Sequence, residues 1–156
     1  MKWITRSHVH VDRVACPWLI RRFIDSEAVF LFVPAGQIEH IANDIGAIPF
    51  DANGVELGHH RSKDDEKIER CSFESIILKY GLKDPGLLRM AKIVHAADID
   101  RDLDTDPIAR GLEAIAAGYS LRFPDDLENL EHQFEVYDAL YAWCRLEAAK
   151  ARPAVA

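Results

Sequence analysis

The sequence predicts a mixed α/β fold in which a small sheet of three to five strands is covered by several helices, with a helix-rich C-terminal half. Three observations predict this class. The first sixty residues mix short apolar runs with turn signals, the remainder follows helical periodicity, and helix-start signals recur in that second part. The 156 residues suit one domain, which we expect to span 1–150, with a disordered tail at 151–156.

Short apolar segments predict the strands. The run that ends before Pro34 is continuously apolar, which is typical of a buried strand. Asn53 and Gly54 form a strong hairpin-turn signal between two later segments. The expected strands are 2–11, as an edge strand, 28–33, 48–50 and 55–57.

Proline and capping residues predict where helices begin. Cys16-Pro17 looks like a helix start, because the missing N–H of proline costs nothing at the first helical position. Four later helices open at Ser72, Asp84, Asp106 and Asp125, all good N-cap residues. The expected helices are 16–25, 35–43, 72–81, 84–98, 106–118 and 125–149. The last one carries a long apolar stripe, which indicates a core helix or, alternatively, a dimer interface.

Charge and motif content exclude several classes of protein. A net charge of −7 disfavours nucleic acid and anionic membranes as partners, and no apolar run approaches the ~20 residues of a membrane span. The phosphate-binding glycine motifs are absent, so we expect no NAD, flavin or nucleotide cofactor. The N-terminus has no apolar signal region, and Cys16, Cys71 and Cys144 form no obvious pair, so we expect a cytoplasmic protein.

Seven histidines and several carboxylates offer metal ligands, although no local motif matches an established metal signature. Imidazole and carboxylate ligands together suit zinc, iron or manganese. A site assembled from distant segments is therefore the hypothesis. Its expected ligands are His10, His60, Glu74 and Asp98, with His8, His59 and His95 as substitutes.

Asp98 stands out because the apolar stripe of its helix, formed by Leu87, Ala91 and Val94, runs directly into it. A carboxylate on a buried face has to be paired, hydrogen-bonded or metal-bound. A salt bridge to an arginine satisfies it without any function, and the candidate arginines are Arg13, Arg21 and Arg22.

Cys16 is the second focus. A thiol at a helix N-terminus near arginines is a potential thiolate, and the same arrangement suits a tetrahedral oxyanion. Arg13, Cys16 and Arg22 are therefore the expected contacts for a small anionic substrate, with the charged segment 61–70 as a lid. The alternative is a buried structural cysteine.

Seven blocks of sequence resemble the chromate-resistance domain family, often called ChrB-type. They are H-V-D-R-V-A-C-P-W-L-I-R-R-F-I-D (10–25), F-L-F-V-P-A (30–35), P-F-D (49–51), G-V-E-L-G-H-H (54–60), C-S-F-E (71–74), I-V-H-A-A-D (93–98) and Y-D-A-L-Y-A-W-C-R (137–145). The resemblance implies a role in bacterial chromate resistance. The DNA-binding function of longer regulators is not carried over, because they have an additional N-terminal region.

The family blocks contain the polar residues already singled out, which supports a shared polar site. These are His10, Asp12, Arg13, Cys16, Arg22, one of His59 and His60, Cys71, Glu74 and Asp98.

Three functions remain open. The first is a metal-binding domain or metalloenzyme of unknown reaction that acts on a small anion. The second is a non-catalytic chromate or oxyanion sensor, and the third is an interaction module with a buried polar network. A homodimer is compatible with each.

Overall fold

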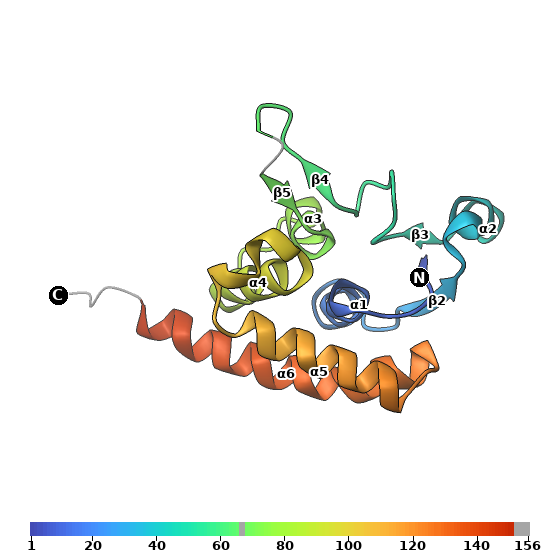
Figure 1. Ribbon diagram of the computed structural model, residues 1–156. Helices are drawn as coiled ribbons and strands as arrows, with labels where there is room; N and C mark the ends of the chain where they lie inside the picture. The colour runs from blue at the N-terminus through green and yellow to red at the C-terminus, as the bar shows by residue number, and fades with distance from the viewer. Residues whose placement is uncertain (66–67, 152–156) are drawn as a thin grey trace.

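The computed structural model describes residues 1–65 and 68–151 and has the mixed α/β, helix-rich architecture that the sequence predicts (Figure 1). In chain order the elements are β1 (Lys2–Arg6), α1 (Val11–Phe23), β2 (Val29–Val33), η1 (Ala35–Gln37), α2 (Ile38–Ile45), β3 (Ile48–Pro49), β4 (His60–Arg61), β5 (Glu69–Arg70), α3 (Ser72–Lys79), α4 (Pro85–Asp98), η2 (Asp100–Thr105), α5 (Ala109–Arg122) and α6 (Asp126–Lys150).

The main sheet has three parallel strands in the order β2-β1-β3. Lys2 lies opposite Val29 on one side of β1, and Trp3 lies opposite Ile48 on the other. The expectation that the first strand is an edge strand is therefore wrong. Its centre is buried on both faces, which is typical of a strand in a covered parallel sheet.

Helix α1 begins at Val11, so the expected start at Cys16-Pro17 is wrong and Pro17 lies inside the helix. The amide of Val14 donates to the carbonyl of His10, which closes the first turn five residues earlier than predicted. An interior proline removes one backbone hydrogen bond and costs about 3 kcal/mol. Burial compensates for this loss, because the segment 14–20 is buried at every position.

The middle of the chain differs from the predicted hairpin. Gly54 makes the expected turn with φ +75°, but only a single bridge, between Phe50 and Leu57, follows from it. A hairpin forms instead within the segment expected to be a charged loop, where β4 pairs with β5 in antiparallel fashion. Figure 1 shows this hairpin projecting from the body of the molecule. Residues 66 and 67 of the expected lid lie outside the described residues.

Four helices form in the second part of the chain as the sequence predicts, and two of them, α4 and α6, begin at the predicted caps. Asp84 and Asp125 accept from the amides of Leu87 and Glu128, at 2.8 and 3.0 Å. The cap of α3 is Cys71, one residue before the expected Ser72. Helix α5 starts at Ala109 rather than next to the predicted Asp106 cap, and it continues to Arg122, beyond the predicted end at residue 118.

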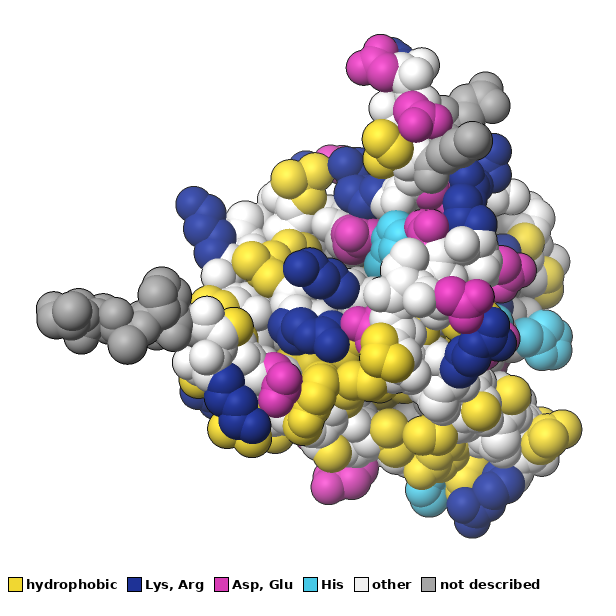
Figure 2. Space-filling model, turned by 60° about the vertical axis from the view of Figure 1, so that its left-hand side comes forward, with side chains coloured by type: hydrophobic (Ala, Val, Ile, Leu, Met, Phe, Trp, Pro, Cys, Tyr) yellow, Lys and Arg dark blue, Asp and Glu magenta, His cyan; other side chains and the backbone are white. Residues whose placement is uncertain are grey.

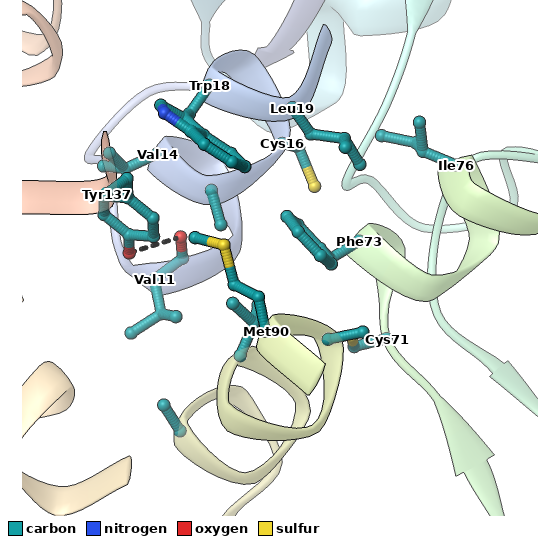
Figure 3. Close-up of a cluster of buried hydrophobic side chains, with 14 of the residues drawn as sticks. Val11, Val14, Cys16, Trp18, Leu19, Cys71, Phe73, Ile76, Met90 and Tyr137 are labelled. Carbon is teal, nitrogen blue, oxygen red and sulfur yellow. Dashed lines mark hydrogen bonds between the residues drawn. The ribbon is translucent and has the colours of Figure 1, made fainter. Parts of the chain in front are cut away.

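The core lies where α1, α3, α4 and α6 meet (Figure 3). Trp18 and Cys16 of α1 face Phe73 of α3 and Met90 of α4 in this cluster. The hydroxyl of Tyr137 on α6 donates to a backbone carbonyl of α1 at 3.4 Å. Leu130, Phe134, Tyr137 and Cys144 of the stripe are buried, whereas Leu127 at its start is 49% exposed, so most of the stripe lies in the core, one of the two alternatives that the sequence left open.

No helix within residues 1–65 and 68–151 combines the length and the apolar character needed to cross a bilayer. The tail expected at 151–156 lies, apart from Ala151, outside the described residues.

Gly86 brings α4 close to α6. A Cβ added there would lie 2.6 Å from Cγ and 3.1 Å from Cα of Arg145. We therefore expect Gly86→Ala to lower the free energy of unfolding by about 1–3 kcal/mol, measured by urea denaturation. The matched control is Gly111→Ala in α5, where a Cβ meets nothing within 4 Å. That change should stabilise by about 0.5–1 kcal/mol through helix propensity, and equal effects of the two variants would contradict the prediction.

Candidate functional site

Two carboxylates and one imidazole from three separate segments converge at one point. Asp12 lies in the first turn of α1, Asp98 ends α4, and His59 directly precedes β4. The Nε2 atom of His59 is 2.8 Å from Oδ2 of Asp98 and 3.4 Å from Oδ2 of Asp12. One ligand atom from each residue lies within 4.8 Å of the others, a spacing that can hold a metal ion.

The N-terminus of α3 holds two of the site's carboxylates. The backbone amide of Ser72 donates to Oδ2 of Asp12 at 2.9 Å, and its hydroxyl donates to Oδ1 of Asp51 at 2.7 Å. The free amides and positive dipole end of a helix favour nearby anions. Ser72 therefore joins a helix terminus to both acids.

Asp51 is the third buried acid and is held by two arginines. Arg6 and Arg13 lie 3.6 and 3.5 Å from its Oδ2 atom, and Nε of Arg6 donates to its carbonyl at 3.1 Å. The backbone of Asp51 is left-handed, with φ 45°, a conformation that aspartate tolerates better than most residues. Its Oδ1 atom is 3.7 Å from Nε2 of His59.

A fourth acid, Glu69 of β5, faces the other nitrogen of His59. Its Oε1 atom is 3.8 Å from Nδ1 of His59. Arg61 and Arg101 lie 3.6 and 3.8 Å from the same carboxylate. The imidazole therefore stands between acids on both sides, and arginines balance the negative charge further out.

A cavity of about 270 Å³ opens beside His59 and is lined in part by Arg6, Asp51 and Glu69. Figure 2 shows charged side chains of both signs crowded around a histidine at the base of the projecting hairpin. The site is thus open to a small molecule on the side of His59, while the acids from α1 and α4 lie deeper.

Burial and close charges shift the pKa values of these groups. Burial, reinforced by the negative charge of Asp98, raises the pKa of Asp12 well above its ordinary value. Hydrogen bonds to Asp12 and Asp98 raise the pKa of His59 to about 11. Burial opposes ionisation of Asp98, but the hydrogen bond from His59 is enough to lower its pKa. Without a bound cation, a protonated His59 therefore neutralises part of this acidic cluster.

One atom of the cluster lacks any hydrogen-bond partner. Oδ1 of Asp12 is buried and accepts no hydrogen bond from any residue in 1–65 or 68–151. A buried, unpaired carboxylate oxygen is costly. This oxygen of Asp12 is therefore free to coordinate a cation.

The backbone before His59 is fixed by close contacts. A Cβ at Gly58 would lie 2.7 Å from the carbonyl oxygen of Ala52, so only glycine fits without a shift. The hydroxyl of Ser75 on α3 donates to the Gly58 carbonyl at 2.7 Å. These contacts set the position from which His59 reaches the two acids.

The structure does not bring together the four ligands expected from the sequence. His10 is an exposed residue at the start of α1, and exposed His60 directs Nε2 to the carbonyl of Glu56 at 2.8 Å. Glu74 belongs to a second cluster, described below, so only Asp98 of the four lies in the central site. His59, expected as a substitute, occupies the histidine position.

Asp12 was absent from the expected ligand set although it lies in a family block. Its signal depends on where α1 begins. With a helix that starts at residue 16, Asp12 is a loop residue, whereas a start at Val11 places it in the first turn and faces it inward.

The three residues expected to contact an anion have separate surroundings. Arg13 lies at the site through Asp51, and it also donates to the carbonyl of His8. Cys16 is buried in the interior of α1, where burial raises the pKa of its thiol well above the ordinary value. Arg22 pairs with Asp138 of α6 at 2.9 Å. Of the three, the structure brings only Arg13 to the acidic cluster.

A second cluster lies between α3, α4 and η2. The Nδ1 atom of His95 is 2.5 Å from Oε1 of Glu74, and its Nε2 atom is 2.6 Å from Oδ2 of Asp102. Cys71 offers its sulfur within 4.8 Å of the ligand atoms of Glu74 and His95. The hydrogen bond to Glu74, with that to Asp102, raises the pKa of His95 to about 9.

Comparison with known proteins gives one family and one similar relative. The pattern of the family described as ChrB, C-terminal domain matches residues 3–144. Protein ChrB of Cupriavidus metallidurans (strain CH34) is 38% identical over 143 residues, which are 90% of this chain and 40% of that protein. The chain thus spans well under half of the relative's length. No solved structure matches the chain.

The pair formed by Arg22 and Asp138 predicts a pH-dependent contribution to stability. Hydrogen bonds from Arg22 and Trp18 lower the pKa of Asp138. Because the pKa of Asp138 is lower in the folded protein, its ionised form stabilises the fold at pH values above the unfolded-state pKa of about 4. This contribution is lost as the pH falls through the folded-state pKa. Because the pair is partly exposed, we expect Arg22→Gln to cost about 0.5–1 kcal/mol at neutral pH, with the difference shrinking in acid.

Urea denaturation of both proteins between pH 7 and pH 3 measures this effect. Arg110→Gln is the control, because its pair with Asp104 is largely exposed and should contribute almost nothing. An Arg22→Gln difference that stays constant down to pH 3 would contradict the prediction.

Proposed function

The chain belongs to the ChrB C-terminal domain family, as its sequence resemblance predicts, and we propose that this chromate-resistance-related domain binds a divalent transition-metal ion through Asp12, His59 and Asp98. The observation that carries the proposal is the buried Oδ1 atom of Asp12, which has no hydrogen-bond partner within the described part of the chain and lies close to an imidazole and a second acid. A cation there would use the unpaired oxygen and replace the proton of His59.

The ligand chemistry indicates the class of metal. Two carboxylates and one imidazole suit manganese, iron or zinc. Glu69 faces the far nitrogen of His59, the position from which a carboxylate orients a ligating histidine. The amide of Ser72 holds the Asp12 carboxylate, and the hydroxyl of Ser72 holds the neighbouring Asp51 together with Arg13. The surroundings of the candidate ligands are therefore fixed by hydrogen bonds and ion pairs.

The open side of the site gives the proposed metal a partner. A small anion in the cavity beside His59 would meet Arg6 on the cavity wall, with Arg13 behind Asp51. A bound metal would supply Lewis-acid or water-activating chemistry if the domain is an enzyme. The three free cysteines are all buried, and we place the domain in the cytoplasm on the basis of unpaired thiols.

A second candidate function is the recognition of an oxyanion without a metal. The specific observation is that Arg6, Arg13 and a protonated His59 surround Asp51 beside an open cavity. An oxyanion in the cavity would gain charge-assisted hydrogen bonds from cationic donors of this kind. Cys16 and Arg22 have no part in this arrangement.

Metal content and metal titration test the first proposal. We expect the site of Asp12, His59 and Asp98 to bind about one equivalent of manganese, iron or zinc. Asp98→Asn should weaken metal binding at this site at least about tenfold, because it removes a ligand charge. His10→Gln and His60→Gln are matched controls, since both side chains are exposed and lie outside the cluster. Equal binding by Asp98→Asn and the controls would overturn the assignment.

Anion titration tests the second candidate. If an oxyanion binds at the arginines, Arg6→Gln should weaken binding of chromate or sulfate about 10- to 100-fold, the cost of one charged hydrogen bond. Arg22→Gln is the control, since Arg22 pairs with Asp138 on α6. Asp98→Asn should not weaken anion binding, because it removes a negative charge near the anion. No measurable heat with either anion would reject this candidate.

A further inference from the structure

The cluster of Cys71, Glu74, His95 and Asp102 combines a thiol with the ion pairs of a histidine, and an ion pair needs no thiol. Its members come from the start of α3, from α4 and from η2. Figure 3 shows Cys71 at the edge of the core, where α3 begins beside α4. A sulfur, a carboxylate oxygen and an imidazole nitrogen lie within 4.8 Å of one another, and these are the three ligand types of protein zinc sites.

The two nitrogens of His95 have different surroundings. Nδ1 faces Oε1 of Glu74 at 2.5 Å, the atom that also accepts from the amide of Cys71, whereas Nε2 faces Asp102 at 2.6 Å. A histidine that ligates zinc commonly donates its other N–H to a carboxylate, which fixes the ring. Asp102 occupies that position.

We propose that Cys71, Glu74 and His95 form a second, softer metal site that takes zinc, with Asp102 as the positioning residue for the His95 ring. This site shares no ligand with the cluster of Asp12, His59 and Asp98, so it goes beyond the function proposed above and does not depend on it.

Space for a fourth ligand lies next to the cluster. A cavity of about 260 Å³ is lined by Glu74 and His95 together with Lys92, Thr105 and Asp106. Three protein ligands and one open position are the arrangement of catalytic zinc sites, whereas structural sites use four protein ligands. The fourth ligand is therefore water or a small molecule that reaches the cavity.

Charge is conserved when the ion binds. One proton leaves the Cys71 thiol and one leaves Nδ1 of His95, while Nε2 keeps its proton toward Asp102. The two departing protons remove two positive charges and the zinc ion adds two, so the cluster has the same net charge with or without zinc.

The local fold allows the cysteine to be tested without losing the helix cap. Cys71 is the N-cap of α3, and its amide donates to Oε1 of Glu74 at 3.1 Å in a capping box. Serine is among the preferred N-cap residues and has nearly the same size. Cys71→Ser therefore removes the thiolate ligand and retains the cap.

Cobalt titration provides a readout that only a cysteine ligand produces. We expect the wild-type chain to develop a near-ultraviolet thiolate-to-cobalt charge-transfer band with about one equivalent of cobalt and to lose it when zinc is added. Cys71→Ser should abolish the band, and His95→Gln should weaken cobalt binding at least about tenfold. Cys144→Ser is the matched control, since it also removes a buried thiol, and it should keep the band.

The Asp98→Asn variant separates this site from the first one. It should keep the cobalt–thiolate band, because Asp98 belongs only to the other cluster. Zinc-loaded Asp98→Asn should also show sulfur at about 2.3 Å from the metal by X-ray absorption, a measurement that needs no change at Cys71. The absence of a sulfur neighbour, or a band that persists in Cys71→Ser, would overturn the second site whether or not the first one binds metal.

Discussion

The buried carboxylate of Asp12 is the interaction on which the arrangement of the site depends. It accepts from the amide of Ser72 at the start of α3 and faces His59 and Asp98, so one side chain of α1 is in contact with three other segments. A buried carboxyl group of this kind needs hydrogen-bond partners, and burial raises its pKa well above the ordinary value. The positions of α3, of the end of α4 and of the segment before β4 are consistent with that requirement.

Much of the fold follows from local chemistry. Asp84-Pro85 and Asp125 predict the starts of α4 and α6 because side-chain caps act over three residues. The start of α1 could not be predicted in the same way. Pro17 is a strong local signal for a helix start, but tertiary burial of the preceding turn outweighs it. The central place of β1 was equally hidden, since pairing on both sides depends on β2 and β3.

The candidate site was predictable in chemistry and only partly in membership. The sequence identified Asp98 from the apolar stripe that runs into it, and it named His59 and His95 as substitutes. Choosing between His59 and His60 requires the direction of the chain after Gly58, which is set by contacts with Ala52 and Ser75 that no local pattern reveals. Glu74 and Asp98 belong to two different clusters because of how α3 packs against α4. This packing is not visible in the local sequence.

The short β4–β5 ribbon gives the two halves of the site unequal rigidity. The acids stand on α1 and α4, which are anchored in the core, whereas His59 precedes a ribbon with only two paired residues on each strand. Such a ribbon opens locally at a much smaller free-energy cost than global unfolding, and its amide hydrogens exchange with solvent correspondingly faster. Local opening of this ribbon therefore releases the segment that carries His59 while the helical core remains intact.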